Sequence, residues 1–301
     1  MVNFYFRRFT NHFFAAAISF VVPVLFVAHH LSFKPSYHNS PDNASAIASV
    51  EPPVSACSLT DATVSACTSS MTLTVDPGYT NYAWSNGSTG NSITVTSSGT
   101  YWWETVRYDE DAVSNGNFEN ASNHYRGFNS SYTRNTTSLV AEGTYAVLQN
   151  PHSEHSSFAT FNDHTKNDGT GYMMVVNGAS TANVTVWSES ISVQTNTTYV
   201  FSVWGASVTS GSPGILNFSI NGVQLGNITL TSTLGAWQNF TVRWSSGSNT
   251  TATIGIVNQN TAASGNDFAL DDISFAPVCR KNITANLYPN PPKPVITNVP
   301  L

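Results

Sequence analysis

The sequence predicts an all-β protein with two β-sandwich domains. Apolar residues come in short alternating runs, and no stretch keeps the 3.6-residue period of an amphipathic helix. Glycine-, proline- and asparagine-containing turn signals separate the runs. Charged residues make up only 9% of the chain and hydrophobic residues 41%, so the chain is globular and its surface is built from uncharged polar side chains.

The N-terminus has the pattern of an export signal. Arg7 and Arg8 precede the apolar run "FFAAAISFVVPVLFVA", residues 13–28, which is short for a membrane span and long enough for the apolar region of a signal peptide. Residues 1–31 are therefore expected to be a signal peptide or an uncleaved anchor, with the rest of the protein extracellular or at the cell surface. Residues 32–66, rich in Ser and Pro, are expected to be a linker.

The net charge excludes some classes of binding partner, and the cysteine count limits the possible disulfides. The net charge is −6, so the chain offers no basic surface for nucleic acid or acidic lipid, and membrane contact is expected only through an uncleaved N-terminal segment. Three cysteines, Cys57, Cys67 and Cys279, leave at least one outside any intrachain disulfide, and the sequence does not choose among the three pairings. No Cys/His spacing indicates zinc.

Residues 67–108 contain four strand candidates separated by turn dipeptides. They are "MTLTV" (71–75), "NYAWS" (81–85), "SITVT" (92–96) and "TYWWETV" (100–106). The stretch "LTVDPGYTNYAWSNGSTGNSITVTSSGTYWWETV" resembles the Ig-like modules of secreted surface proteins in Bacteroidetes-type bacteria. That resemblance implies a small β-sandwich with Trp84 in its core.

Residues 112–279 have a denser strand pattern, and eight or nine strands in one domain suggest a two-sheet jelly roll. The candidate strands are 144–150, 171–178, 183–193, 198–208, 214–220, 223–231, 237–246, 251–260 and 267–275. Asn221-Gly222 between two apolar strands predicts a two-residue hairpin. Residues 280–301 are expected to be a Pro-rich tail or the start of a further module.

Three segments of this larger domain carry a second resemblance: "NGNFEN" (115–120), "NDHTKNDGTGYMMV" (162–175) and "ALDDISFAPVC" (269–279). They resemble the jelly-roll carbohydrate-binding modules, which are galactose-binding-like, and are similar to the MAM adhesion domain, whose internal cysteines are absent here. The resemblance implies a non-catalytic module for carbohydrate binding or cell adhesion. The expected partner is a polysaccharide or cell-surface glycan, with surface proteins as a further candidate.

The pair Asp271-Asp272 lies inside a strand that otherwise reads as buried. Plain alternation places Asp271 on one face with Ile273 and Phe275, and a buried carboxylate needs a cation, donors or a shifted pKa. The resemblance implies that the first and last strands lie side by side, so that Glu119 approaches Asp271, with Asp163 arriving from its loop. A structural calcium ion is the expected cofactor. Its candidate ligands are Glu119, Asp163, Asp271 and, in a secondary role, Asp272; hydrogen bonding to loop amides is the alternative.

Sugar binding would use exposed aromatic rings that stack on pyranose faces. In "TYVFSVW" the residues Tyr199, Phe201 and Val203 share one face, and Trp204 belongs to the other. The ligand-binding candidates are Trp204 together with Tyr125, Phe128 and Tyr132 from the loop after the first strand, and core packing is the alternative for each ring.

No catalytic set is recognisable. In "HSEHSSF", residues 152–158, the histidines are three positions apart in a Ser-rich loop, whereas a helical zinc site needs four. There is no nucleophile elbow, phosphate loop or dinucleotide fingerprint. The sequence therefore predicts a non-catalytic extracellular carbohydrate-binding or adhesion protein. Two alternatives stay open: a protein-binding adhesion or surface-layer module, and an accessory region of a larger secreted hydrolase.

Overall fold

The computed structural model describes residues 61–75, 79 and 81–288, and this part of the chain is all-β, as the sequence predicts. Its strands are β1 (Ala62–Ala66), β2 (Met71–Thr74), β3 (Ala83–Trp84), β4 (Ser92–Val95), β5 (Gly99–Val106), β6 (Thr133–Arg134), β7 (Thr144–Leu148), β8 (Met173–Asn177), β9 (Thr185–Ser192), β10 (Thr198–Ser207), β11 (Ile215–Ile220), β12 (Val223–Thr229), β13 (Gln238–Ser245), β14 (Thr251–Asn258) and β15 (Phe268–Leu287). Two single-turn 3-10 helices accompany them, η1 (Tyr108–Glu110) and η2 (Pro151–Ser153).

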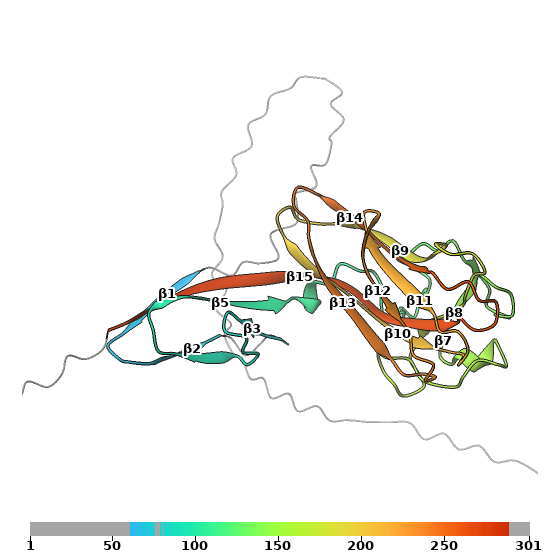
Figure 1. Ribbon diagram of the computed structural model, residues 1–301, viewed down its shortest axis with the longest axis horizontal. Helices are drawn as coiled ribbons and strands as arrows, with labels where there is room; N and C mark the ends of the chain where they lie inside the picture. The colour runs from blue at the N-terminus through green and yellow to red at the C-terminus, as the bar shows by residue number, and fades with distance from the viewer. Residues whose placement is uncertain (1–60, 76–78, 80, 289–301) are drawn as a thin grey trace, which may run out of the picture. The chain divides into compact units, whose positions relative to one another are not determined.

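Two sheets pack face to face in the larger domain (Figure 1). One has the strand order β13-β10-β15-β8-β7-β6, and the other has the order β12-β11-β14-β9. Every pairing is antiparallel except β6 with β7. The order shows why segments far apart in the sequence meet, because β15 near the end of the chain lies between β10 and β8.

The last strand, β15, is 20 residues long and serves two sheets in succession. Its first half pairs with β10 and β8, and its second half pairs with β5 and, in parallel, with β1 (Figure 1). Two expected boundaries therefore change. Residues 280–287, expected in a tail, continue the strand, and β1 lies inside the expected linker. In β1 partly buried and exposed side chains alternate, and in residues 282–287 partly buried and buried ones do; such alternation suits a strand better than a linker.

The larger domain and the small module each have their own apolar core. Between the two large sheets lie Phe118, Trp187, Phe201, Phe218 and Phe275, each no more than 1% exposed. A smaller cluster unites β2, β3, β4 and β5 with the second half of β15. Trp84 lies in it at 1% exposure, as expected. A third cluster covers part of the outer face of the large sheet, where the loops around Leu139 and Phe158 pack against Ala269.

The predicted strands agree closely with the observed ones. Each of the four candidates in the small module and each of the nine in the larger domain overlaps a strand, and β1 and β6 are additional. The hairpin at Asn221-Gly222 is confirmed, since both residues have positive φ, 51° and 77°, as a type I′ turn requires.

The expected signal segment, most of the expected linker and residues 289–301 lie outside the described residues. Within the described part of the chain, no helix is long and apolar enough to cross a membrane. Cys279 is disulfide-bonded, and Cys67 is a free, exposed thiol.

Candidate functional site

A β-bulge in β15 decides where its two aspartates point. Trp204 of β10 pairs with Asp271, but Ser202 pairs with Ser274, so two residues of β15 lie opposite Val203 alone. Asp272 adopts φ 44°, a left-handed conformation that is uncommon for a residue other than glycine. The extra residue shifts the alternation by one position.

The bulge corrects the face expected for Asp271. Phe268 and Leu270 before it, and Ile273 and Phe275 after it, all lie in the core between the sheets. Asp271 therefore shares the outer face with Ala269, not the inner face with Ile273. It is nevertheless fully buried, because the loop of residues 163–165 covers it.

Donors from that loop hold the Asp271 carboxylate. Oδ2 accepts the backbone N–H groups of His164 at 2.8 Å and Thr165 at 3.2 Å, and Oδ1 accepts the N–H of Asp272 at 2.8 Å. Burial, and next the neighbouring Asp272 carboxylate, raise the pKa of Asp271 to about 8, although these hydrogen bonds oppose the rise.

Asp272 is tied to the same loop by its side chain. Oδ2 lies 2.5 Å from His164 Nδ1, and Oδ1 accepts the Thr165 hydroxyl at 2.7 Å. The two adjacent carboxylates thus bind one loop, Asp271 through the loop's backbone and Asp272 through its side chains.

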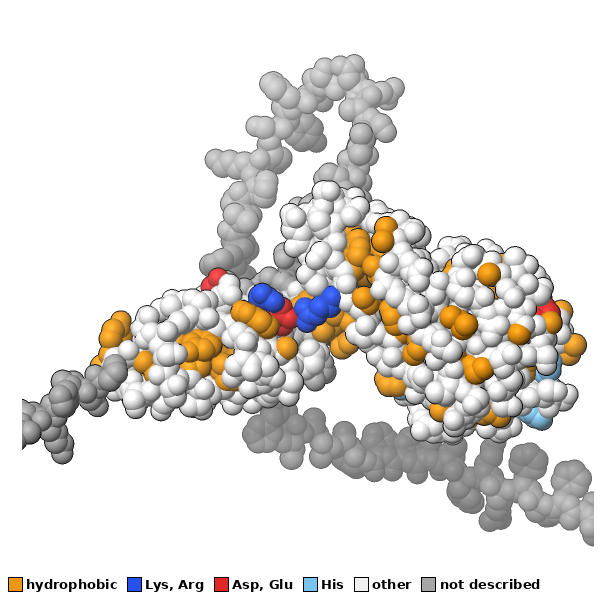
Figure 2. All heavy atoms as spheres, in the orientation of Figure 1, with side chains coloured by type: hydrophobic (Ala, Val, Ile, Leu, Met, Phe, Trp, Pro, Cys, Tyr) orange, Lys and Arg blue, Asp and Glu red, His pale blue; other side chains and the backbone are white. Residues whose placement is uncertain are grey.

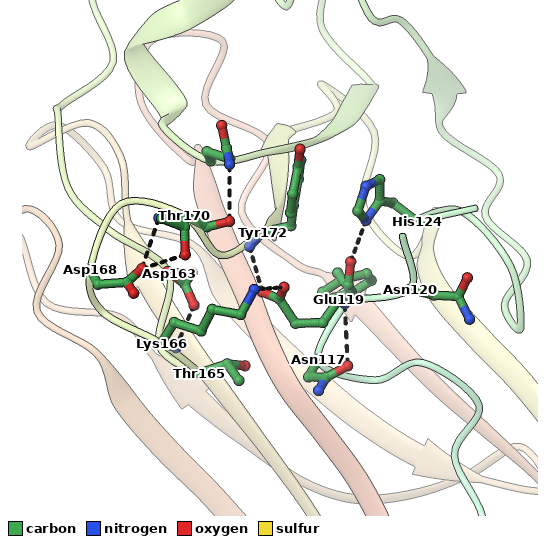
Figure 3. Close-up of polar contacts among 12 residues, drawn as sticks. Asn117, Glu119, Asn120, His124, Asp163, Thr165, Lys166, Asp168, Thr170 and Tyr172 are labelled. Atoms are coloured by element: carbon green, nitrogen blue, oxygen red, sulfur yellow. Dashed lines mark hydrogen bonds and ion pairs between the residues drawn. The ribbon is translucent and has the colours of Figure 1, made fainter. Parts of the chain in front are cut away.

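Glu119 and Asp163 lie at the other end of this loop (Figure 3). Glu119 Oε2 is 2.5 Å from the ammonium of Lys166, and Oε1 accepts the N–H of Tyr172 at 2.6 Å. Asp163, fully buried, accepts the N–H of Lys166 through Oδ2 at 2.6 Å. Its Oδ1 has no hydrogen-bond partner among the described residues.

The four predicted metal ligands therefore surround one loop, residues 163–166, but each has its own donors. Among residues 61–75, 79 and 81–288, no three His, Cys, Asp or Glu side chains are grouped as a metal site. Hydrogen bonds to amides, the alternative to a cation, describe the main contacts of Asp271, whereas Glu119 combines one such bond with the Lys166 ion pair. Of these four carboxylates, only Asp163 keeps a buried oxygen with no hydrogen-bond partner in the described part of the chain.

Beside the bulge, the outer face of the large sheet is hollowed into a cleft of about 400 Å³. Its floor comes from β10 and β15, and its wall comes from the segment between η1 and Asn117. The lining residues are Tyr108, Asp111, Val113, Asn115, Gly116, Asn117, Ser202, Trp204, Asp272, Ile273 and Ser274. The wall is fixed to β15 by backbone bonds, since Ala112 donates to the carbonyl of Phe275 and Ile273 donates to that of Gly116.

Trp204 is the largest side chain of the cleft floor, and it is partly exposed while Tyr199, Phe201 and Val203 are buried, as the strand pattern predicts. The His164 ring stacks on it, with ring centroids 3.9 Å apart and planes 20° apart. His164 also meets Trp237 edge to face at 5.7 Å. The ring of Trp204 is thus held in place by its neighbours, and its exposed part faces the cleft.

A row of exposed polar side chains continues from Trp204 along the edge strand β13. Asn239 pairs with Trp204 and Thr241 pairs with Ser202, and both β13 residues are exposed. Asn239 Nδ2 donates to Ser202 Oγ at 2.9 Å, and Thr241 Oγ1 lies 3.3 Å from the same hydroxyl. This combination of a fixed aromatic ring with amide, hydroxyl and carboxylate groups suits a ligand that has apolar faces and hydroxyl edges.

Core packing, the alternative for each of the other three aromatic rings, describes Tyr132 fully and Tyr125 and Phe128 in part. Tyr132 is 5% exposed, and its hydroxyl accepts the N–H of Ala179. Tyr125 and Phe128 are partly buried against the main core, and Tyr125 carries the guanidinium of Arg134 over its ring at 4.7 Å. The loop after the first strand folds back onto the sandwich, because three large rings gain more from burial than from exposure.

Sequence reasoning missed Tyr108. It is 45% exposed and lines the cleft. It directly precedes the acidic residues 109–111, and the bonds of this segment to β15 place it beside the cleft. A single Tyr beside a charged run gave no signal that could have identified it.

No protein-family model matches the chain, and no curated protein matches it. Several solved structures match part of the chain. TmCBM61 in complex with β-1,4-galactotriose is 11% identical, with a TM-score of 0.36, over 57% of this chain and 97% of that one. The CBM22-1 xylan-binding domain of Xyn10C from Paenibacillus barcinonensis is 16% identical, with a TM-score of 0.31, over 50% and 93%.

An arabinose-bound α-L-arabinofuranosidase, MgGH51, is 14% identical, with a TM-score of 0.39; the match covers 56% of this chain and 26% of the enzyme. The chain thus spans about a quarter of that enzyme. At these scores the likenesses carry no argument about the site, which rests on the geometry described above.

Proposed function

We propose that the protein is a non-catalytic carbohydrate-binding protein and that the cleft beside Trp204 receives the glycan. The observation that carries the proposal is the partly exposed Trp204 ring on the floor of a cleft of about 400 Å³ that Tyr108 also lines. Aromatic rings offer a sugar a flat apolar surface, and the neighbouring Ser202, Asn239 and Asp272 offer hydrogen bonds to its hydroxyls.

Replacing Trp204 by Ala tests this proposal. Loss of the stacked ring is expected to weaken retention on the polysaccharides that the full chain binds at least tenfold, as for other aromatic anchors in binding sites. The measurement is a pull-down against a panel of insoluble polysaccharides, followed by titration with the soluble fragments of those retained.

The matched control is Tyr288→Ala, which removes a 57% exposed ring that does not line the cleft. It is expected to bind as the unaltered protein does. The proposal that this cleft binds carbohydrate is contradicted if no polysaccharide in the panel retains the full chain, or if both variants bind equally. Retention of surface proteins but of no polysaccharide would favour the protein-binding adhesion module.

Export to the cell surface is part of the same proposal. The disulfide at Cys279 supports it, because disulfides form and persist in oxidising compartments. The apolar N-terminal run supports it from the sequence. A longer reading frame that carries a catalytic domain would favour the alternative that the chain is an accessory region of a larger secreted hydrolase.

We also propose that calcium stabilises the larger domain by binding at the loop of residues 163–166. The buried Oδ1 of Asp163, with no donor among the described residues, supports this site, since a carboxylate oxygen is a ligand that calcium prefers. The Lys166 ammonium on Glu119 argues against Glu119 as a ligand.

The expected result is a higher melting temperature in millimolar calcium than in EDTA. Saturation at one hundred times the dissociation constant would add about 2.7 kcal/mol, roughly 5–10 °C for a domain of this size. Asp163→Asn is expected to abolish the difference. Identical melting of the unaltered protein with calcium and with chelator contradicts the calcium site and leaves the carbohydrate cleft unaffected.

A further inference from the structure

A pair of arginines lies on the outer face of the same sheet, at the end of the polar row that begins at Trp204. Arg243 follows Asn239 and Thr241 on β13 and pairs with Val200 of β10. Arg280 lies on β15 and pairs with Glu104 of β5. On the face drawn in Figure 2, Lys and Arg side chains gather over β5 and β15 near β13.

Both guanidinium groups are fixed by one buried carboxylate. Glu104 is 5% exposed; its Oε2 accepts from Arg243 Nη2 at 2.8 Å, and its Oε1 accepts from Arg280 Nε at 2.7 Å and from Arg280 Nη2. The Arg280 guanidinium also lies over the Trp102 ring, 4.1 Å from its centroid. A guanidinium held in this way needs little further ordering to bind a second anion.

The charges of this cluster do not cancel. Two guanidinium groups face one carboxylate, so the cluster keeps a net charge of about +1, whereas the whole chain carries −6. The side chains of Arg243 and Arg280 are 52% and 51% exposed, so each still faces solvent. This local excess of positive charge suits a carboxylate, which a guanidinium binds with two parallel hydrogen bonds.

The distance from the cleft matches an extended ligand. Arg243 is four residues beyond Asn239 on one strand, about 14 Å at 3.4 Å per residue. The exposed Thr241, the partly exposed Ser274 and the buried Ser202 between them fill the interval with hydroxyl groups on paired strands. A glycan chain of several sugar units that stacks on Trp204 would therefore reach Arg243 along a continuous polar surface.

We propose, on the basis of the proposed function, that the cleft binds polysaccharides that carry carboxylate groups, with Arg243 and Arg280 as the subsite for a uronate. The neutral part of the glycan stacks on Trp204, and one carboxylate further along the chain pairs with the guanidinium groups. Lys281 has the same charge, but it follows Arg280 directly on β15 and therefore points to the opposite face, beside Ile283 and Trp103.

The test compares three uronate polymers, polygalacturonate, alginate and hyaluronan, each with its carboxyl-reduced form, by affinity electrophoresis of the full chain. At least one polymer is expected to bind ten times more tightly than its reduced form, with the difference shrinking as salt rises. Arg243→Gln is expected to remove that difference and keep the weaker binding to the reduced form. Lys281→Gln is expected to leave both unchanged.

Each alternative outcome is decisive. Equal affinity for the uronate and reduced forms, or equal losses in Arg243→Gln and Lys281→Gln, overturns the uronate subsite while the carbohydrate cleft stands. Equally tight binding to polyglutamate overturns it too, since the cluster would then attract any polyanion. Binding to neither form of any polymer overturns it as well. The proposed function itself fails if the wider polysaccharide panel also retains nothing.

Because Arg280 keeps its bond to Glu104 in Arg243→Gln, that variant is expected to fold, and its melting curve checks this.

Discussion

Replacing Gly116 by Ala is expected to destabilise the protein by about 3 kcal/mol or more. A Cβ at this position would lie 1.8 Å from the carbonyl oxygen of Ile273 and 2.8 Å from its carbonyl carbon, closer than any real Cβ contact. Both neighbours are backbone atoms of β15, so the strand or the wall segment must move. That movement also breaks the bond from Ile273 N–H to the Gly116 carbonyl, and overpacking of this kind is costly.

The measurement is chemical denaturation of the two proteins, with Gly90→Ala as the matched control. A Cβ at Gly90 would meet only Ser92 O, at 4.0 Å, and is expected to change stability by less than about 0.5 kcal/mol. Because Gly116 also lines the cleft, its variant is expected to lose glycan binding together with stability. Equal stability of the two variants would show that the wall segment does not sit against the bulge.

A pH-dependent loss of stability is expected from Asp267, which is 6% exposed. Burial raises its pKa to about 6, against the hydrogen bonds from Gly178 N–H and the Thr209 hydroxyl. Between the unfolded value of 3.8 and about 6, the folded protein keeps a proton that the unfolded chain has released. Stability from this group is therefore complete below pH 4 and falls as the pH rises through 6.

The size of this effect follows from the pKa difference. Because each tenfold change corresponds to about 1.4 kcal/mol, the ionised carboxylate destabilises the folded protein by up to about 3 kcal/mol at pH 7. Asp267→Asn carries no charge, and its amide can accept from Gly178 N–H through Oδ1 and donate to the Thr209 hydroxyl through Nδ2, so this variant is expected to be more stable at pH 7 by about this amount and similar at pH 4. Other buried carboxylates, such as Asp271, contribute equally to both proteins, so the difference in unfolding free energy isolates Asp267. A difference that does not change between pH 4 and pH 7 contradicts the prediction.

The strands could be predicted because their period and turns are local properties of the sequence. Asn221-Gly222 forms the expected hairpin, and the buried faces of β10 follow the alternation of Tyr199, Phe201 and Val203. The placement of Asp271 could not be predicted in the same way. One extra residue in a bulge reverses every later side chain, and the bulge depends on pairing with β10, which is distant in sequence.

The residues of the candidate site also differ in whether a local sequence pattern predicts their position. The alternation of its own strand predicts Trp204 on the outer face, and Trp204 lies there. The burial of Tyr132 has no local signal because the loop that carries it packs against distant strands, and the position of Tyr108 has none because its wall segment is held by bonds to β15 and to Glu189 of β9. The arginine cluster joins β5, β13 and β15, and no local pattern shows that these residues meet.

The most direct test of the account is a titration followed by NMR, with the indole N–H signals of the tryptophans as probes. The full chain is titrated with a soluble fragment of whichever polysaccharide retains it, and the indole signals are assigned by single substitutions. If the glycan binds in the cleft, the Trp204 signal shifts most, the Trp237 signal shifts less through the contact with His164, and the signals of the buried Trp84 and Trp187 do not change. Saturable binding that leaves the Trp204 signal unchanged would contradict the account, because the glycan would then bind elsewhere.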